Sequence, residues 1–79
     1  MELSDEFTAD VELLNLFELD GSQSGLKIHH EASPARIASA KRLFESKLTT
    51  QIDGGYLTPL GISAAEHAQA LVRILRAGA

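Results

Sequence analysis

The chain has 79 residues, of which 44% are hydrophobic, no cysteine, and a formal net charge of −4 at pH 7. This length allows one domain, and the lack of cysteine excludes disulfides and thiolate-bound zinc. The longest apolar runs are only a few residues, so no membrane-spanning segment is expected. The acidic N-terminus lacks the basic region of a signal peptide. We therefore expect a single-domain cytoplasmic protein covering residues 1–79.

The charges are distributed unevenly along the chain. Residues 1–20 contribute −7, residues 27–47 contribute +3, and residues 48–79 are neutral. We expect a dipolar molecule whose basic end can meet phosphate. The negative total, however, disfavours non-specific binding to nucleic acid.

The first predicted helix covers about residues 5–19, with Ser4 as its N-cap. Its inward stripe carries Phe7, Val11, Leu14 and Phe17 at helical spacing. Its acidic residues are expected on a solvated outer face.

Residues 22–31 are ambiguous. The alternation over residues 26–29 is typical of a strand, whereas Ser22 could cap a short helix. We favour the helix, because two helices joined by a turn at residues 31–33 would complete a helix-turn-helix.

The clearest predicted helix covers residues 33–47, with Ser33 as N-cap and Pro34 at the first helical position. The inward stripe is expected to hold Ile37, Ala40, Phe44 and Leu48, flanked by Leu43. The opposite face is expected to present Ala35, Ala38, Ser39, Arg42 and Ser46, with Arg36 beside it. Small residues, Arg and Ser suit a helix lying in the major groove. The alternative is an ordinary exposed, alanine-rich face.

Two short strands, residues 49–52 and 56–58, are predicted around Asp53-Gly54-Gly55 as a type I′ turn. Thr58 then caps a last helix over residues 59–77, with Pro59 at its first position. Apolar positions after residue 70 cover more than one face of this helix. We therefore expect homodimerisation through residues 60–77.

The sequence offers little for catalysis or metal binding. His29, His30 and Glu31 lack the spacing of a metal motif, and neither a nucleophile elbow nor a phosphate-binding loop is present. We predict no enzymatic activity, no cofactor and no metal site.

The segments Arg42-Leu-Phe-Glu-Ser-Lys-Leu48 and Asp53-Gly-Gly-Tyr-Leu-Thr-Pro-Leu-Gly61 resemble the winged-helix pattern, in which a recognition helix enters a wing and then a further helix, and this resemblance covers about residues 33–75. With Gly25-Leu-Lys-Ile-His-His30 and Ala65-Glu-His-Ala-Gln-Ala-Leu71, the chain also resembles a small gammaproteobacterial family labelled hypothetical DNA-binding proteins. The resemblance implies a bacterial cytoplasmic protein and brings no established activity. The predicted fold is mainly α with a short β-hairpin, similar to a winged helix-turn-helix.

The sequence is consistent with two alternative functions. The first is a dimeric DNA-binding protein, a transcriptional regulator that reads the major groove of double-stranded DNA with helix 33–47. Its contacts would come from Lys27, Ser33, Arg36, Ser39, Lys41, Arg42 and Lys47. The alternative is a non-catalytic protein-interaction module that binds a basic partner through the acidic N-terminal helix.

Overall fold

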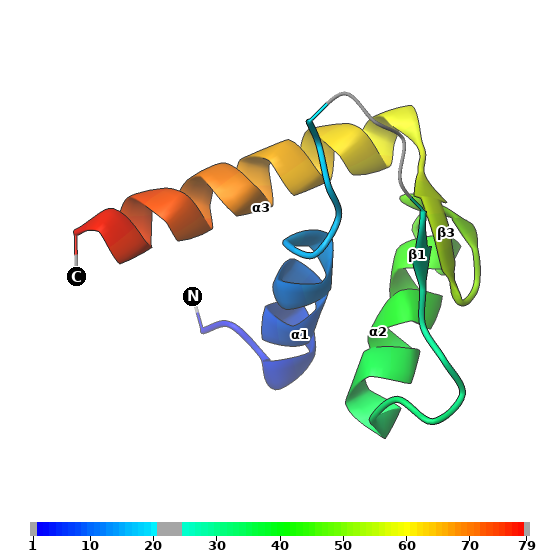
Figure 1. The fold of residues 1–79 in the computed structure, drawn as a ribbon. Coiled ribbons are helices and arrows are strands. Elements are labelled where there is room, and N and C mark those ends of the chain that lie inside the picture. Colours follow the sequence, from blue (N-terminus) through cyan, green and yellow to red (C-terminus); the bar gives the residue numbers. More distant parts are fainter. Residues whose placement is uncertain (1, 21–24, 79) are drawn as a thin grey trace.

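The computed structural model describes residues 2–20 and 25–78. In chain order it contains helix α1 (Asp5–Leu14), strand β1 (Leu26–Lys27), helix α2 (Pro34–Glu45), strands β2 (Thr49–Gln51) and β3 (Gly54–Leu57), and helix α3 (Pro59–Ala77). Helices predominate and a small sheet lies at one end (Figure 1). The prediction of a mainly α fold with a hairpin is confirmed at this level.

The three predicted N-caps are confirmed. The hydroxyl oxygens of Ser4, Ser33 and Thr58 accept hydrogen bonds from the backbone N–H groups three residues later, at 3.0, 3.2 and 3.0 Å. Each cap satisfies a donor that a helix N-terminus would otherwise leave free. Helix α1 ends at Leu14, earlier than predicted, because the chain tightens there into three-residue turns.

The favoured helix over residues 22–31 is wrong, because residues 26–27 form a strand. The predicted cap Ser22 lies outside the described residues. Strand β1 runs antiparallel to β3 and gives the sheet order β1-β3-β2. Glycine permits this pairing, since a Cβ on Gly54 would lie 2.1 Å from the carbonyl oxygen of Leu26. In the described ranges, α2 is therefore the only helix between β1 and β2, and the first helix of a helix-turn-helix is missing there.

The hairpin forms, but its turn lies one residue earlier than predicted. Ile52 and Asp53 occupy the turn, and positive φ angles occur at Gly54 (116°) and Gly55 (76°). The register of β2 against β3 shifts between Thr49 and Gln51, so β3 carries an extra residue opposite β2. The positive φ angles of the two glycines thus belong to the irregular strand β3 and not to a type I′ turn.

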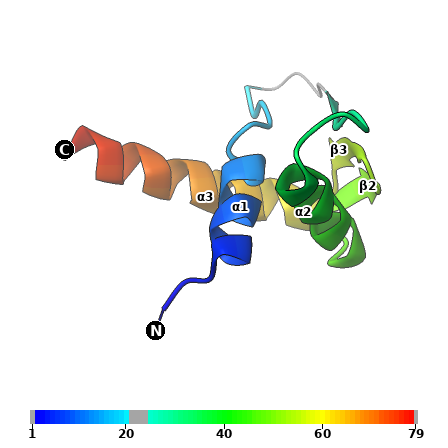
Figure 2. The ribbon, with the colours of Figure 1, turned by 90° about the horizontal axis from the view of Figure 1, so that it is seen from below.

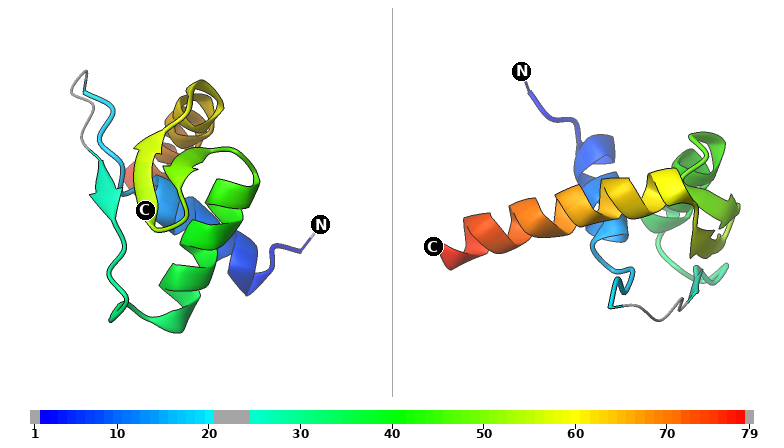
Figure 3. Two further views of the ribbon diagram at one scale, coloured as in Figure 1. Left: turned by 90° about the vertical axis from the view of Figure 1, so that its right-hand side faces the viewer. Right: turned by 90° about the horizontal axis from the view of Figure 1, so that it is seen from above.

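Helices α1 and α2 lie side by side and α3 runs across them (Figure 2). The core consists of Leu13, Leu14, Ala40, Leu43, Ala65 and Ala68. Small residues let α3 approach closely, and a Cβ on Gly61 would lie 1.9 Å from the carbonyl oxygen of Leu48. The first half of α3 is therefore part of the core, whereas the second half extends beyond α1 (Figure 3).

Helix α2 is rotated about its axis relative to the prediction. Ser39 and Leu43 are buried, whereas Ile37 and Phe44 from the predicted inward stripe are 40% and 39% exposed. Ala40 is buried as predicted. The rotation turns the polar side of α2 toward α1 and leaves an apolar side facing outward.

Candidate functional site

The Arg42 side chain, the predicted base reader, is held by α1. Its Nη2 lies 2.8 Å from Oδ1 of Asp10, and its Nε lies 3.1 Å from both carboxylate oxygens of Asp10. Nη1 adds a 3.4 Å contact to Oε2 of Glu6. The hydrogen bonds to Asp10 raise the pKa of Arg42 above its usual value, with a further contribution from the nearby charges of Asp10 and Glu6. The charge-assisted hydrogen-bond donors of Arg42 are thus used for contacts within the molecule.

Ser39 shares the same carboxylate. Its side chain is fully buried, and its hydroxyl donates to Oδ1 of Asp10. The prediction that Ser39 faces outward toward a groove is therefore wrong. The physical reason is that the partly buried carboxylate of Asp10 in α1 accepts hydrogen bonds from Ser39 and Arg42, which lie about one turn apart on the same side of α2. The acidic excess of the first twenty residues was the available signal for this contact.

The other predicted contact residues remain at or near the surface, on different elements. Lys27 of β1 pairs with Asp53 of the hairpin turn at 2.9 Å, and its hydrogen bond lowers the pKa of Asp53. Ser33 is exposed and caps α2, and Arg36 is half-buried. Lys41 and Lys47 are exposed, and Lys47 adopts a left-handed backbone conformation (φ 64°) that ends α2.

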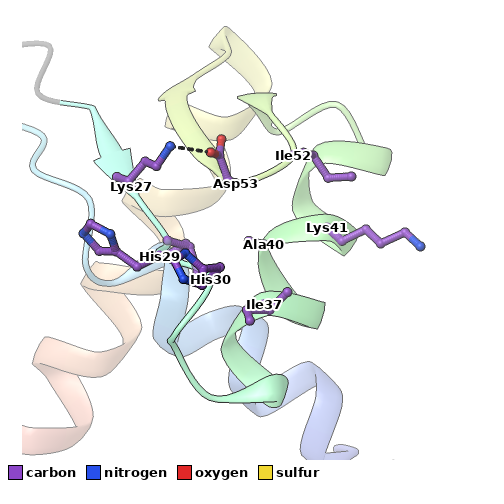
Figure 4. A pocket seen from close by; sticks show the side chains of 9 residues that line it. Lys27, His29, His30, Ile37, Ala40, Lys41, Ile52 and Asp53 are labelled. Atoms are coloured by element: carbon purple, nitrogen blue, oxygen red, sulfur yellow. Dashed lines mark ion pairs between the residues drawn. The ribbon is translucent and has the colours of Figure 1, made fainter.

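A groove of about 410 Å³ opens between α2, the end of β1 and the hairpin turn. Apolar atoms of Ile28, Ile37, Ala40 and Ile52 line it, with polar groups from Lys27, His29, His30, Lys41 and Asp53. Figure 4 shows His30 beside Ile37, while Lys41 extends outward from α2. Because Lys27 and Asp53 neutralise each other, the remaining fixed charge of the groove comes from Lys41.

Sequence reasoning missed the apolar character of this surface. The sequence predicts Ile37 and Phe44 in the core, and it predicts Ile52 in a strand, whereas the structure places Ile52 in the turn. Ile52 is 54% exposed. The helical spacing of Ile37, Ala40 and Phe44 marks an apolar face but does not say whether the protein core or a partner covers it.

Among the described residues, no group of three His, Cys, Asp or Glu side chains is placed to hold a metal ion. Within the same ranges, no helix is both long enough and apolar enough to cross a bilayer.

Fold and surface together define a small, mostly helical domain with a three-stranded antiparallel sheet, compatible with a winged-helix topology. The chain belongs to a family of unknown function, DUF5669, whose model matches residues 1–76. No curated protein matches it significantly, and no solved structure does.

Proposed function

We propose that this protein is a non-catalytic protein-interaction module of winged-helix-like architecture. Its binding face would be the outer side of α2 together with the adjoining groove. The observation that carries this proposal is the orientation of α2, whose polar side faces α1 and whose apolar side faces outward. Arg42 and Ser39 are bound to Asp10, while Ile37, Phe44 and the turn residue Ile52 are between 39% and 54% exposed.

The arrangement of the elements supports the architectural part of the proposal. Helix α2 leads directly into the β2–β3 hairpin, and β1 adds to the free edge of β3. A winged helix combines its recognition helix and wing in the same order. The departure is the single helix between β1 and β2, which leaves α2 without the helix that usually precedes it.

The groove indicates the chemistry of the partner. Its apolar lining suits aliphatic or aromatic side chains, and the exposed cation Lys41, which extends outward from α2 beside the groove (Figure 4), suits a carboxylate next to them. We therefore propose that the partner supplies a short segment that combines apolar residues with Asp or Glu. A polyphosphate backbone would leave Ile37, Phe44 and Ile52 without apolar contacts.

The proposal can be tested with a phage-displayed library of random twelve-residue peptides selected on the immobilised full chain. We expect enriched peptides to combine apolar and acidic residues and to lose binding to an Ile52→Glu variant. The matched control is Leu60→Glu, which changes an exposed aliphatic residue (60% exposed) outside the groove. Failure to enrich any sequence, or equal binding to both variants, would reject the groove as the site.

DNA binding is a second candidate, and the exposed cations Lys41 and Lys47 around α2 favour it. In this proposal the protein is a transcriptional regulator that contacts phosphates through Lys27, Lys41 and Lys47, with Arg36 and Ser33 beside them. Arg42 would have to leave Asp10 and Glu6 before it could read a base. Electrophoretic shift assays on a pool of genomic duplexes test this candidate. Each lysine replaced by alanine should reduce the salt slope by about 1, and absence of any salt-dependent shift would exclude it.

A further inference from the structure

The hairpin turn contains a dipeptide, Asp53-Gly54, whose two residues can react with each other. In an Asp-Gly pair, the backbone nitrogen of the glycine can attack the side-chain carboxyl carbon of the aspartate. The five-membered ring that forms is a cyclic imide. Glycine favours the reaction, because no side chain hinders the approach of its nitrogen. The sequence holds a second such pair, Asp20-Gly21, which offers a reference for the reactivity of the dipeptide.

The reaction needs no co-reactant other than water. Asp53 reacts as the carboxylic acid, and the bond between the Gly54 nitrogen and the Asp53 Cγ forms while the nitrogen proton and the carboxyl hydroxyl leave as water. Water then opens the ring at one of its two carbonyl carbons. Opening at Cγ restores aspartate, whereas opening at the main-chain carbonyl carbon yields isoaspartate, in which the backbone runs through Cγ and the α-carboxylate is free. The product has the same atoms and the same oxidation state as the starting chain.

Strand β1 and the residue after it restrain this dipeptide in three ways. Nζ of Lys27 lies 2.9 Å from Oδ2 of Asp53 (Figure 4), and this pairing favours the carboxylate, which is a poor electrophile. Ile28 donates its backbone N–H to the Asp53 carbonyl oxygen at 2.8 Å, which restricts the rotation about the Asp53 Cα–C bond that ring closure requires. Gly54 is buried, and a Cβ on it would lie 2.1 Å from the carbonyl oxygen of Leu26, so its backbone has little room to move.

These restraints depend on a very short strand. Strand β1 consists of two residues, and the Lys27 and Asp53 side chains of the ion pair are 67% and 36% exposed. An exposed ion pair contributes little stability, and an element with few buried contacts opens locally more often than the core does. The Asp53-Gly54 dipeptide therefore becomes free to react each time β1 separates from β3.

We propose that Asp53-Gly54 is a site of backbone isomerisation that β1 keeps unreactive while it is paired with β3. The isoaspartate product inserts one additional carbon atom into the backbone of the hairpin turn. Because Ile52 and Asp53 line the groove beside α2, the product alters one wall of that groove. The proposal rests on the turn and on β1, and it holds whether or not a peptide binds the groove.

The first test follows the reaction in water enriched in a heavy oxygen isotope, since each opening of the imide ring adds one oxygen atom from the solvent. The full chain is incubated at neutral pH, either folded or unfolded in guanidinium chloride, then digested in ordinary water and analysed by mass spectrometry. In the unfolded chain, Asp53 and Asp20 should take up the isotope at similar rates. In the folded chain, Asp53 should take it up at least about tenfold more slowly. An unlabelled Asp53 in the unfolded chain, or the same rate in both states, would overturn the proposal.

The second test removes the ion pair. Lys27→Ala should raise the rate of isoaspartate formation at residue 53 in the folded chain about two- to fivefold, because it removes one of the three restraints. The matched control is Lys41→Ala, which removes another exposed lysine of the groove and should leave the rate unchanged. Asp53→Glu should give no product at this position, since its longer side chain would have to close a six-membered ring. Circular dichroism verifies that the variants are folded, and equal rates for the two lysine variants would refute protection by the ion pair.

Discussion

At the scale of single residues, Asp10 organises the contact between α1 and α2. Its carboxylate accepts hydrogen bonds from the buried hydroxyl of Ser39 and from the guanidinium of Arg42. A buried donor without an acceptor is costly, so the contact depends on the carboxylate more than on either donor alone. This use of Arg42 removes the residue that the DNA-reading hypothesis needed most.

Asp10→Ala should therefore destabilise the protein, because it leaves the Ser39 hydroxyl and the Arg42 guanidinium without their acceptor. We expect the melting temperature to fall by about 5 °C or more. Glu18→Ala, which removes an exposed acid beyond the end of α1, is the matched control. Thermal unfolding followed by circular dichroism provides the measurement. Equal melting temperatures for both variants would show that the network contributes no net stability.

Gly61 is the second decisive residue. A helical glycine normally costs about 1 kcal/mol relative to alanine, yet a Cβ here would lie 1.9 Å from the Leu48 carbonyl oxygen. Gly61→Ala should thus lower the free energy of unfolding by at least about 2 kcal/mol. Gly78→Ala is the control, because a Cβ on Gly78 would lie 3.8 Å from its nearest neighbour, the carbonyl oxygen of Ile74. Urea denaturation distinguishes the two, and an unchanged midpoint for Gly61→Ala would contradict the close packing of α3 against Leu48, between α2 and β2.

At the scale of elements, the small sheet is held together by its turn as well as by its ladder. Ile28 donates its backbone N–H to the Asp53 carbonyl at 2.8 Å, and Lys27 pairs with the Asp53 carboxylate. Both contacts join β1 to the hairpin turn. A strand of two residues has few ladder hydrogen bonds, so these additional contacts matter for its position beside the groove.

The Lys27–Asp53 pair predicts a modest acid sensitivity. The hydrogen bond from Lys27 lowers the pKa of Asp53 in the folded state, so its contribution to stability is present above the unfolded value of about 3.9. That contribution is lost as the pH falls further, through the lower folded-state pKa. Asp53→Asn should accordingly be less stable at pH 7 and lose less stability between pH 7 and about 2.5. Thermal melts at both pH values, with Glu18→Gln as control, check this, and an identical pH dependence would refute it.

At the scale of the whole molecule, the charge reversal along the chain acquires a structural role. Glu6 and Asp10 from the acidic start meet Arg42 inside one copy. Part of the negative end is thus an internal contact surface, whereas Lys41 and Lys47 remain exposed.

The homodimerisation expected through residues 60–77 would make the melting temperature depend on protein concentration, because dimerisation stabilises the folded state by mass action. We expect the unmodified protein to melt several degrees higher when its concentration rises about a hundredfold. Ile74→Glu should show no such rise. Differential scanning calorimetry over that concentration range measures both, and a concentration-independent transition for the unmodified chain would argue against a dimer.

The sequence by itself determined the features that depend on local chemistry. Ser4, Ser33 and Thr58 start the helices because their hydroxyls accept neighbouring N–H groups, and Pro34 and Pro59 fit the first turn. The existence of the hairpin followed from its glycines and β-branched residues, although its turn lies one residue earlier than predicted. None of these features needs a distant contact.

Only the tertiary structure decided the identity of β1 and the orientation of α2. Residues 26–27 become a strand because β3 offers them a partner across Gly54 and Gly55. Helix α2 turns Ser39 and Arg42 inward because Asp10, about thirty residues earlier, accepts their hydrogen bonds. Periodicity identifies an apolar side and a polar side of a helix, but the neighbouring elements determine which side is buried.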